Sequence, residues 1–496
     1  MRRLSHDGAA IRRLQPVRRP PARSLATAAA IFAGLFLLAA CTGTPGADAG
    51  AGDQDAGGSG GAGARAGDSD HVLVSSRGRR FPPAPEVPRG PLSDETAAAV
   101  EELLSGLSVV GIDREAIEVL AESEDPRILW LLRDLMRFSR EADREAIMDA
   151  FDQLTGTTLP REHHNEIADR LIAWDLPAPP GYADMKRRVF SLIDPRWTPF
   201  FRAEPSEIDW RLVEWGGVLI DDRLDGSPGV PCNSCIPALD DPPVTDAAGG
   251  DWYPDDALVF GVSINGEARA YPKNIMEVHE MVNDTLGGRR IGMPYCTLCL
   301  SAQAYFTDNV EGFQPVLRTS GLLSRSNKFM YDISTMSAVD TFTGEAISGP
   351  LLEAGVRLEQ ASVITTSWGE WKAAYPETTI VAQDGGVPGR VYPADPLRGR
   401  DDNGPIFPVG DVDQRLPTQV RVLGVIGPDG TPVAFPVPNA VLALREGDSV
   451  ELAGVEVELD AGGLRAFIDG EDASSHEAFW FAWSQFRPDT LVWERG

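Results

Sequence analysis

Positive charge is scarce in this sequence. Its 496 residues include 45 lysines and arginines against 74 aspartates and glutamates, which gives a formal net charge of −29 at pH 7. Such a surface stays soluble and repels the phosphates of nucleic acids and of anionic lipid headgroups. The composition therefore excludes a nucleic-acid-binding function.

Long apolar runs are also rare, and the one of note lies near the N-terminus. Residues 1–24 contain seven arginines and one acidic residue, and the nearly apolar run Ala26–Ala40 follows. A basic flank and an apolar run too short to span a bilayer are typical of an export signal. Leu38-Ala39-Ala40-Cys41 resembles a bacterial lipobox, whose cysteine is lipidated. We predict a signal peptide over residues 1–40 and a lipid anchor at Cys41, with a single transmembrane anchor as the alternative. The protein would then lie outside the cytoplasm, in the bacterial cell envelope.

Composition divides the rest of the chain into three parts. Residues 41–92 are rich in glycine, alanine and proline and predict a disordered tether. Residues 93–217 place apolar side chains at helical spacing and predict a helical domain, either HEAT-like repeats or a small bundle, that could bind a protein partner. Residues 218–496 alternate polar and apolar side chains around turn signals such as Asn265-Gly266, which indicates mainly β structure. The expected fold class is α+β.

The β-rich part repeats its own landmarks. A glycine precedes an Ala-aromatic-Pro triplet at fixed spacing, and a Trp-x-x-Trp-x4-Pro-x-Thr pattern follows. These features first occur at Gly266, Ala270–Pro272 and Trp368–Thr378. They occur again at Gly430, Ala434–Pro436 and Trp480–Thr490. Such self-similarity predicts a duplicated unit, with copy one over residues 256–382, a linker over 383–417 and copy two over 418–496. Short helices are expected near Asn274–Met281, Ser367–Ala374 and Glu477–Phe486.

Only copy one carries a chemically suggestive motif. It holds Tyr295-Cys296-Thr297-Leu298-Cys299 where copy two has Asp460-Ala461-Gly462-Gly463. The flanking residues alternate as in strands, so the cysteines are expected on a β-hairpin turn. Copy two is shorter by about residues 301–355, which we expect to form an insertion over the site. Copy one should therefore hold the site, and copy two should be scaffold.

Several motifs in this part resemble the domain-of-unknown-function family 3179. They are Ile236–Pro242, Ala270–Pro272, His279-Glu280-x-x-Asn283-Asp284, Tyr295–Ala302, Ser320–Leu322, Met330-Tyr331-Asp332-x-x-Thr335 and Thr343–Ala346. The resemblance covers about residues 236–496 and implies no established activity. Some relatives look like selenoproteins, which favours redox use of the Cys-x-x-Cys pair. This chain departs from the pattern at Val339, where a tryptophan is usual, and by the added pair Cys232-Asn233-Ser234-Cys235.

With Cys41 lipidated, four cysteines remain in two Cys-x-x-Cys pairs, and three uses of them are open. Outside the cytoplasm each pair can form a local disulfide. Cys296 and Cys299 can instead exchange thiols and disulfides, with His279 as an imidazolium neighbour that lowers a thiolate pKa. The same three residues can bind zinc or copper, with Met330 or the added cysteines as further ligands.

Our leading hypothesis is thiol redox chemistry at Cys296 and Cys299, and whether the protein is an enzyme stays open. Metal binding is the runner-up, and a non-catalytic interaction protein with structural disulfides is the third reading. The family-like motifs add four secondary candidates: Glu280, Asn283, Asp284 and Asp332. Asp332 begins an Asp-x-x-Thr pattern, which is typical of turns in which the carboxylate accepts from nearby backbone.

Overall fold

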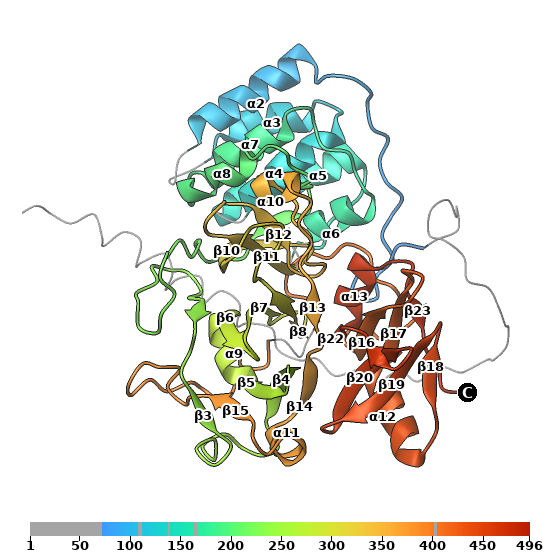
Figure 1. Cartoon of the computed structure of the whole chain (residues 1–496). Helices are drawn as coiled ribbons and strands as arrows, with labels where there is room; N and C mark the ends of the chain where they lie inside the picture. The colour runs from blue at the N-terminus through green and yellow to red at the C-terminus, as the bar shows by residue number, and fades with distance from the viewer. Residues whose placement is uncertain (1–71, 108–111, 137–138, 162–165, 401–403) are drawn as a thin grey trace, which may run out of the picture. The chain divides into compact units, whose positions relative to one another are not determined.

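The computed structural model describes residues 72–107, 112–136, 139–161, 166–400 and 404–496, which Figure 1 draws in colour. Residues 64–496 form one compact unit. The predicted signal peptide, Cys41 and the first part of the predicted tether lie outside the described residues. Within the described part of the chain, no helix is long and apolar enough to cross a membrane.

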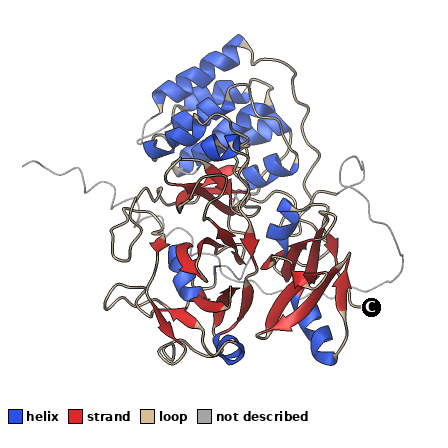
Figure 2. Cartoon of the chain, viewed as in Figure 1, coloured by secondary structure: helices blue, strands red, loops and turns tan. Residues whose placement is uncertain are grey.

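Residues 94–201 are mainly helical (blue in Figure 2). Polar side chains cap these helices where the sequence offers them, since Ser93 accepts from the backbone N–H of Thr96 and Asp113 accepts from that of Glu115. Gly156 ends the helix before it in the left-handed conformation. The helices are α2 (Asp94–Gly106), α3 (Arg114–Ala121), α4 (Leu129–Leu135), α5 (Glu141–Thr155), α6 (Glu166–Ala173), α7 (Tyr182–Phe190) and α8 (Thr198–Phe201).

Three sheets are built mainly from copy one, accompanied by α9 (Lys273–His279), α10 (Gly349–Glu353) and α11 (Trp368–Ala374). In order across the first sheet, the strands are β1 (Val213–Trp215), β10 (Leu317–Ser324), β11 (Asn327–Asp332) and β12 (Ala338–Asp340). The second sheet has the order β13 (Gln360–Ala361), β9 (Ala304–Phe306), β7 (Arg289–Cys296), β6 (Met281–Leu286) and β2 (Leu239–Asp240), with β8 (Ser301–Ala302) beside β7. The third has the order β14 (Ile364–Ser367), β4 (Leu258–Ile264), β5 (Glu267–Pro272), β15 (Thr379–Val381) and β3 (Val244–Asp246).

Copy two forms two further sheets with α12 (Val437–Glu446) and α13 (Trp480–Phe486). The strands are, in order, β22 (His476–Phe479), β16 (Arg421–Ile426), β17 (Pro432–Pro436) and β23 (Leu491–Val492); then β18 (Val450–Leu452), β19 (Val455–Asp460), β20 (Gly463–Ile468) and β21 (Glu471–Asp472). The fold is therefore mixed α+β, as predicted. The short helices expected from the sequence are confirmed as α9, α11 and α13.

The sheets β14-β4-β5-β15 and β22-β16-β17-β23 have the same strand order and pairing directions. In each sheet a hairpin forms the centre (β4–β5 or β16–β17), and a helix follows it (α9 or α12). A second helix (α11 or α13) then leads to an outer strand (β15 or β23) that pairs in parallel with the second strand of the hairpin (β5 or β17). Both hairpins arise at the predicted turns, and Asn265-Gly266 takes positive φ at both positions, as a two-residue hairpin of this twist requires.

The repeated tryptophans and glycines occupy equivalent places in these two sheets. Trp371 donates its indole N–H to the Thr378 hydroxyl at 2.9 Å, and Trp483 donates to Thr490 at the same distance. Both tryptophans are buried, as expected for residues that pack a core. Their rings lie where a glycine leaves space, because a Cβ on Gly261 would come within 2.3 Å of Trp371.

The predicted domain boundary at residue 217 does not separate two cores. Strand β1, which precedes it, pairs with β10 of copy one, with Val213 opposite Ser324. The buried apolar side chains of the helices continue into Leu322, Phe329 and Tyr331 without a break. The Trp197 indole N–H donates to the carbonyl oxygen of Ser320 at 2.7 Å. Apolar helix faces and strands thus share one core.

The end of the predicted disordered tether is packed against the folded unit, so the tether does not extend to residue 92. Val74 and Phe81 are buried, and the carbonyl oxygen of Val74 accepts from the backbone N–H of Val412 at 2.9 Å. The Pro82 carbonyl oxygen accepts from the Trp174 indole at 2.7 Å. The apolar and carbonyl groups of this segment find partners that a reading of composition alone does not reveal.

Candidate thiol site

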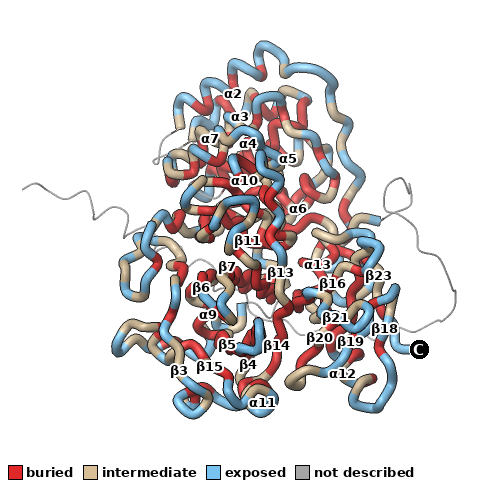
Figure 3. Tube along the Cα trace, viewed as in Figure 1, coloured by how far each residue is buried: buried red, intermediate tan, exposed pale blue. Residues whose placement is uncertain are grey.

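The cysteine motif lies on a hairpin turn, as predicted. Strand β7 ends at Cys296, and β8 pairs back on it with Tyr295 opposite Ala302. The backbone N–H of Cys299 donates to the carbonyl oxygen of Cys296 at 3.2 Å, which closes the turn. Leu300 completes it with a positive φ of 51°. Strand β7 is buried from Ile291 onward (Figure 3), so the turn lies inside the protein.

Both thiols are free and buried, with Cys296 3% exposed and Cys299 fully covered. They converge on one acceptor, because the Sγ atoms of Cys296 and Cys299 lie 3.6 and 3.4 Å from the carbonyl oxygen of Ser326. Ser326 is in the turn between β10 and β11, within the segment 301–355 expected to lie over the site. That segment does supply the immediate cover of the thiols.

A buried ion pair lies beside the thiols. Glu280 ends helix α9 in the left-handed conformation and pairs with the ammonium group of Lys328 on β11. The hydroxyl of Thr297, between the two cysteines, donates to Glu280 Oε1 at 3.3 Å. The Lys328 side chain is only 5% exposed, so its charge acts in a medium where electrostatic interactions are strong.

The two thiols differ in acidity. Burial and the negative charge of Glu280 oppose ionisation of Cys296, but the hydrogen bonds from Cys299 and the positive charge of Lys328 outweigh them and lower the pKa of Cys296. Burial raises the pKa of Cys299, and its hydrogen bond to the Cys296 sulfur adds to this. The pair is therefore set up with one thiol that ionises first and one that holds its proton.

Copy two closes the site, although it was expected to be scaffold only. The backbone N–H of Phe479, at the end of β22, donates to the carbonyl oxygen of Cys299 at 2.8 Å. Figure 1 shows β22 beside β8. Both cysteines belong to one apolar cluster with Trp480 and Trp483 of copy two. The difference arises because the cysteine turn is an apolar surface that one copy alone cannot bury.

His279 is fully buried and bonded away from the cysteines. Its Nδ1 lies 2.6 Å from the carbonyl oxygen of Pro237, and its Nε2 lies 2.7 Å from the Tyr392 hydroxyl. Burial, opposed by the bond to Pro237, lowers the pKa of His279 to about 4. The ring is neutral at pH 7, so the predicted role as an imidazolium neighbour of a thiolate is not supported.

The predicted metal ligands do not converge either. Among the described residues, the group of three metal-ligating side chains found within 4.8 Å of one another is Asp221, Cys232 and Cys235, and not Cys296, Cys299 and His279. Met330 is buried in a cluster that does not include the cysteines.

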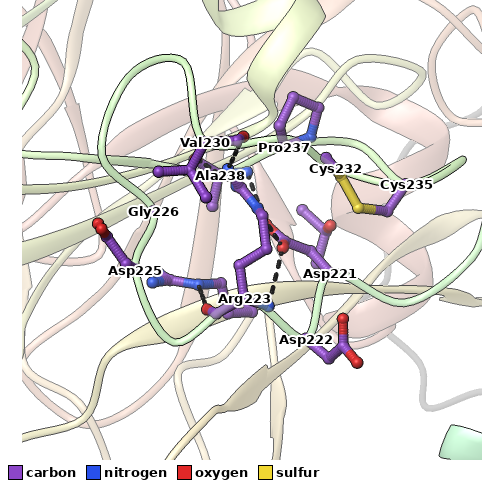
Figure 4. Close-up of polar contacts among 12 residues, drawn as sticks. Asp221, Asp222, Arg223, Asp225, Gly226, Val230, Cys232, Cys235, Pro237 and Ala238 are labelled. Atoms are coloured by element: carbon purple, nitrogen blue, oxygen red, sulfur yellow. Dashed lines mark hydrogen bonds and ion pairs between the residues drawn. A yellow bond between two sulfur atoms is a disulfide. The ribbon is translucent and has the colours of Figure 1, made fainter. Parts of the chain in front are cut away.

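The added pair, Cys232 and Cys235, is a disulfide in a partly exposed loop (Figure 4). Its Cα atoms are 5.6 Å apart, within the usual range. The neighbouring Asp221 carboxylate is fully buried and accepts from Arg223 at 2.7 Å and from the backbone N–H of Ala238 at 2.9 Å. With both sulfurs and the carboxylate already bonded, this group offers no ready metal site.

The secondary candidates serve structural hydrogen bonds. Asn283 donates to Asp240 at 2.9 Å and accepts from the backbone N–H of Leu317 at 3.0 Å. Asp284 accepts from Arg269 at 2.6 Å and from Tyr271 at 2.9 Å. Asp332 accepts from the backbone N–H groups of Val316 and Thr335, the local role that the turn pattern predicts. Of the four, Glu280 alone joins the thiol site.

Sequence reasoning missed Ser326 and Lys328. A lysine directly before the apolar run Phe329-Met330-Tyr331 is unusual in a buried strand and could have been noticed, because a buried ammonium group needs a partner. Ser326 acts through its backbone carbonyl, for which the sequence carries no signal.

A mixed α+β fold with two similar sheets, and a buried dithiol on the turn between β7 and β8, defines the class of this protein. Residues 233–442 match the model of the family described as Protein of unknown function (DUF3179), which supports the resemblance that the motifs indicated. The match ends within α12 and leaves most of copy two outside it. Comparison with curated proteins and with solved structures yields no match.

Proposed function

We propose that this protein is a thiol–disulfide redox protein of the bacterial cell envelope, in which Cys296 and Cys299 interconvert between a dithiol and a disulfide. The observation that carries the proposal is the unequal acidity of two free thiols that lie on one tight turn beside the Lys328–Glu280 ion pair. Of the two charges, that of Lys328 favours the thiolate of Cys296 and that of Glu280 opposes it, so the lowered pKa of Cys296 comes first from the hydrogen bond from Cys299.

The exchange follows from the positions of the two sulfurs. The Cys296 thiolate attacks a sulfur of a partner disulfide, a mixed disulfide forms and one partner thiolate leaves. Cys299 then loses its proton and attacks the Cys296 sulfur, which forms the internal disulfide and releases the second partner thiolate. The cysteine pair is oxidised by two electrons, the partner is reduced, and the two protons pass to the released thiolates.

Access to the thiols requires a movement, since both are covered. The cover is the turn between β10 and β11 together with the end of β22. Ser326 contacts both thiols through its carbonyl oxygen, so displacement of this turn would remove that contact. We expect the turn to open when a partner binds.

Thiol titration of the full chain with oxidised glutathione tests the proposal. Two thiols should be found before oxidation and none after it, and Cys296→Ala with Cys299→Ala should remove the exchange. Cys232→Ala with Cys235→Ala is the matched control and should leave it intact. If both wild-type thiols persisted after treatment with oxidised glutathione, the pair would not be redox-active.

Metal binding is the second candidate, and the convergence of both sulfurs on the Ser326 carbonyl favours it. Thiolates suit zinc and Cu(I). A third protein ligand would have to come from rearrangement, because His279 is bonded elsewhere. Elemental analysis of the protein purified without chelator, before and after alkylation of the thiols, distinguishes this candidate from redox use.

The lipid anchor at Cys41 belongs to the same proposal. The residue ends the apolar run in the lipobox pattern and begins a segment rich in glycine, alanine and aspartate. Cys41→Ala should release the protein from the membrane fraction or leave an uncleaved precursor. A normally processed N-terminus that stays with the membrane in this variant would contradict it.

We also infer that the two similar sheets are copies of one duplicated unit, and that only the first kept a site. The shared strand order and the matched tryptophan–threonine hydrogen bonds support this origin.

A further inference from the structure

A cleft of about 340 Å³ lies between residues 342–360 of copy one and residues 424–487 of copy two. The cysteines are not among its lining residues. Its size suits a small organic molecule. The lining combines aromatic rings with two arginines, a composition that differs from the acidic surface elsewhere in the chain.

The aromatic wall of the cleft is already ordered. Phe342 stacks on Phe486 with ring centroids 4.8 Å apart and an interplanar angle of 13°, and it lies 5.7 Å from Trp483. His476 packs edge-on against Phe342 at 5.2 Å. Rings held in this way present an apolar surface at little entropic cost to a ligand.

His476 is part of the fixed wall and not a source of charge. It is 3% exposed, and its Nε2 and Nδ1 each lie 3.2 Å from a glutamine side-chain nitrogen, of Gln303 and Gln360 respectively. A neutral imidazole has one donor and one acceptor, so one amide must present its oxygen. The Oε1 atom of Gln303 has no other partner, and turning that amide lets it accept from His476 Nε2–H.

The positive charge of the cleft comes from its arginines. Arg357, exposed at the rim, pairs with Glu345 at 3.5 Å. Arg487 is half-buried, and among the described residues its guanidinium group has neither an ion-pair partner nor a side-chain hydrogen bond. In a chain with a large excess of acids, a half-buried guanidinium that faces a cleft without a counter-ion indicates an anion site.

We propose that this cleft binds a small organic monoanion, a carboxylate carried on an apolar ring-sized group. The carboxylate lies on Arg487, with Arg357 at the rim, and the apolar group lies on Phe342 and Trp483. Glu359 also lines the cleft, and its negative charge disfavours dianions such as phosphate monoesters. The site is separate from the thiols and does not depend on their chemistry.

Calorimetric titration of the full chain with benzoate tests the proposal, with benzamide, acetate and inorganic phosphate as comparisons. Benzoate should bind, and benzamide and acetate should bind at least about tenfold more weakly because each lacks one half of the recognition. Arg487→Gln should weaken benzoate binding by a similar factor of about ten or more. Arg445→Gln, an exposed arginine on α12, is the matched control and should leave it unchanged.

A second variant keeps the test decisive if Arg487→Gln unfolds. Ala473→Leu adds bulk to the lining without changing an arginine and should abolish benzoate binding while the melting temperature stays near that of the wild type. Absence of benzoate binding to the wild type overturns the proposal. So does binding of benzamide or phosphate as tight as that of benzoate, and so does unchanged binding by Arg487→Gln.

Discussion

Copy one and copy two each contain a sheet of the same topology, and each copy contacts a turn of the other. The Cys299 carbonyl oxygen of copy one accepts from the Phe479 N–H at the end of β22. The Ala461 carbonyl oxygen, in the corresponding turn of copy two, accepts from the Thr366 hydroxyl at 2.5 Å in β14, the counterpart of β22. Between these two contacts the backbone N–H of Val363 donates to the Ser475 carbonyl oxygen at 2.9 Å, and these residues hold equivalent positions. The exchange is close to symmetric.

The two turns differ in what they contain. Copy one places two thiols where copy two places Ala461-Gly462-Gly463. In copy two the glycines are needed for close approach, since a Cβ on Gly463 would come within 2.8 Å of the Thr365 carbonyl oxygen. Copy one thus accommodates two thiols at a scaffold contact without loss of the packing that both copies require, and the copy without cysteines remains part of the wall around them.

The largest expected effects test the shared scaffold. Gly261→Ala and Gly424→Ala each direct a methyl group into the ring of the partner tryptophan, Trp371 or Trp483, at 2.3 and 2.1 Å. Both should lower the free energy of unfolding by about 3 kcal/mol or more, because a closed tryptophan pocket cannot yield. Urea unfolding followed by circular dichroism measures the loss.

Gly430→Ala is the control for this pair of variants. That glycine, unlike Gly261 and Gly424, has a positive φ of 85°, and no atom lies within 4 Å of the added methyl group. It should cost only about 1 kcal/mol, the penalty of left-handed backbone. Tolerance of alanine at one of the two tryptophan-facing glycines but not the other would show that the copies are not structural equivalents.

Local signals were sufficient for the repeated sheet but not for the chemistry of the site. The Asn265-Gly266 hairpin and helix α11 are encoded within a few residues, by turn chemistry and by the Ser367 cap. The partners of His279 and of the cysteines, in contrast, come from Tyr392 and Lys328, distant in sequence. Burial decides whether a histidine is charged, and burial is set by tertiary contacts that a single sequence does not reveal.

Each copy contributes a buried histidine, and the two should give the same pH dependence. Burial lowers the pKa of His279 to about 4 and that of His476 to about 3. In the unfolded chain a histidine binds a proton near pH 6.5, so between that value and the folded pKa the unfolded state holds more protons. Stability should therefore fall as the pH drops below about 6.5, by on the order of 2–3 kcal/mol for each histidine at pH 4.

Glutamine variants separate the two contributions. His279→Gln and His476→Gln each lack the titrating group, so the slope of unfolding free energy against pH between 6.5 and 4 should be shallower in both. The slope is compared and not the absolute stability, since either variant also loses hydrogen bonds. An unchanged slope in one variant would place that histidine in a solvated, ionisable environment and break the parallel between the copies.

The smallest expected effect concerns the thiol site, which copy two lacks. Lys328→Gln removes the positive charge that helps to lower the pKa of Cys296 and leaves an amide that still donates to Glu280. The pKa of Cys296 should rise, so less thiolate is present at pH 7 and alkylation by iodoacetamide should slow by about tenfold, the effect of one pKa unit. Mass spectrometry across a pH series measures the alkylation rate, and the pH at which that rate is half-maximal should move upward.

Lys372→Gln is the matched control, because Lys372 also pairs with an acid, Asp255 at 2.7 Å, and is not among the charges that act on the thiols. If both variants slowed alkylation equally, the change would reflect access to the buried turn and not thiolate stabilisation. If the half-maximal pH of alkylation in Lys328→Gln stayed at its wild-type value, the acidity of Cys296 would come from the cysteine turn and not from Lys328. The buried ion pair would then be a structural feature of copy one.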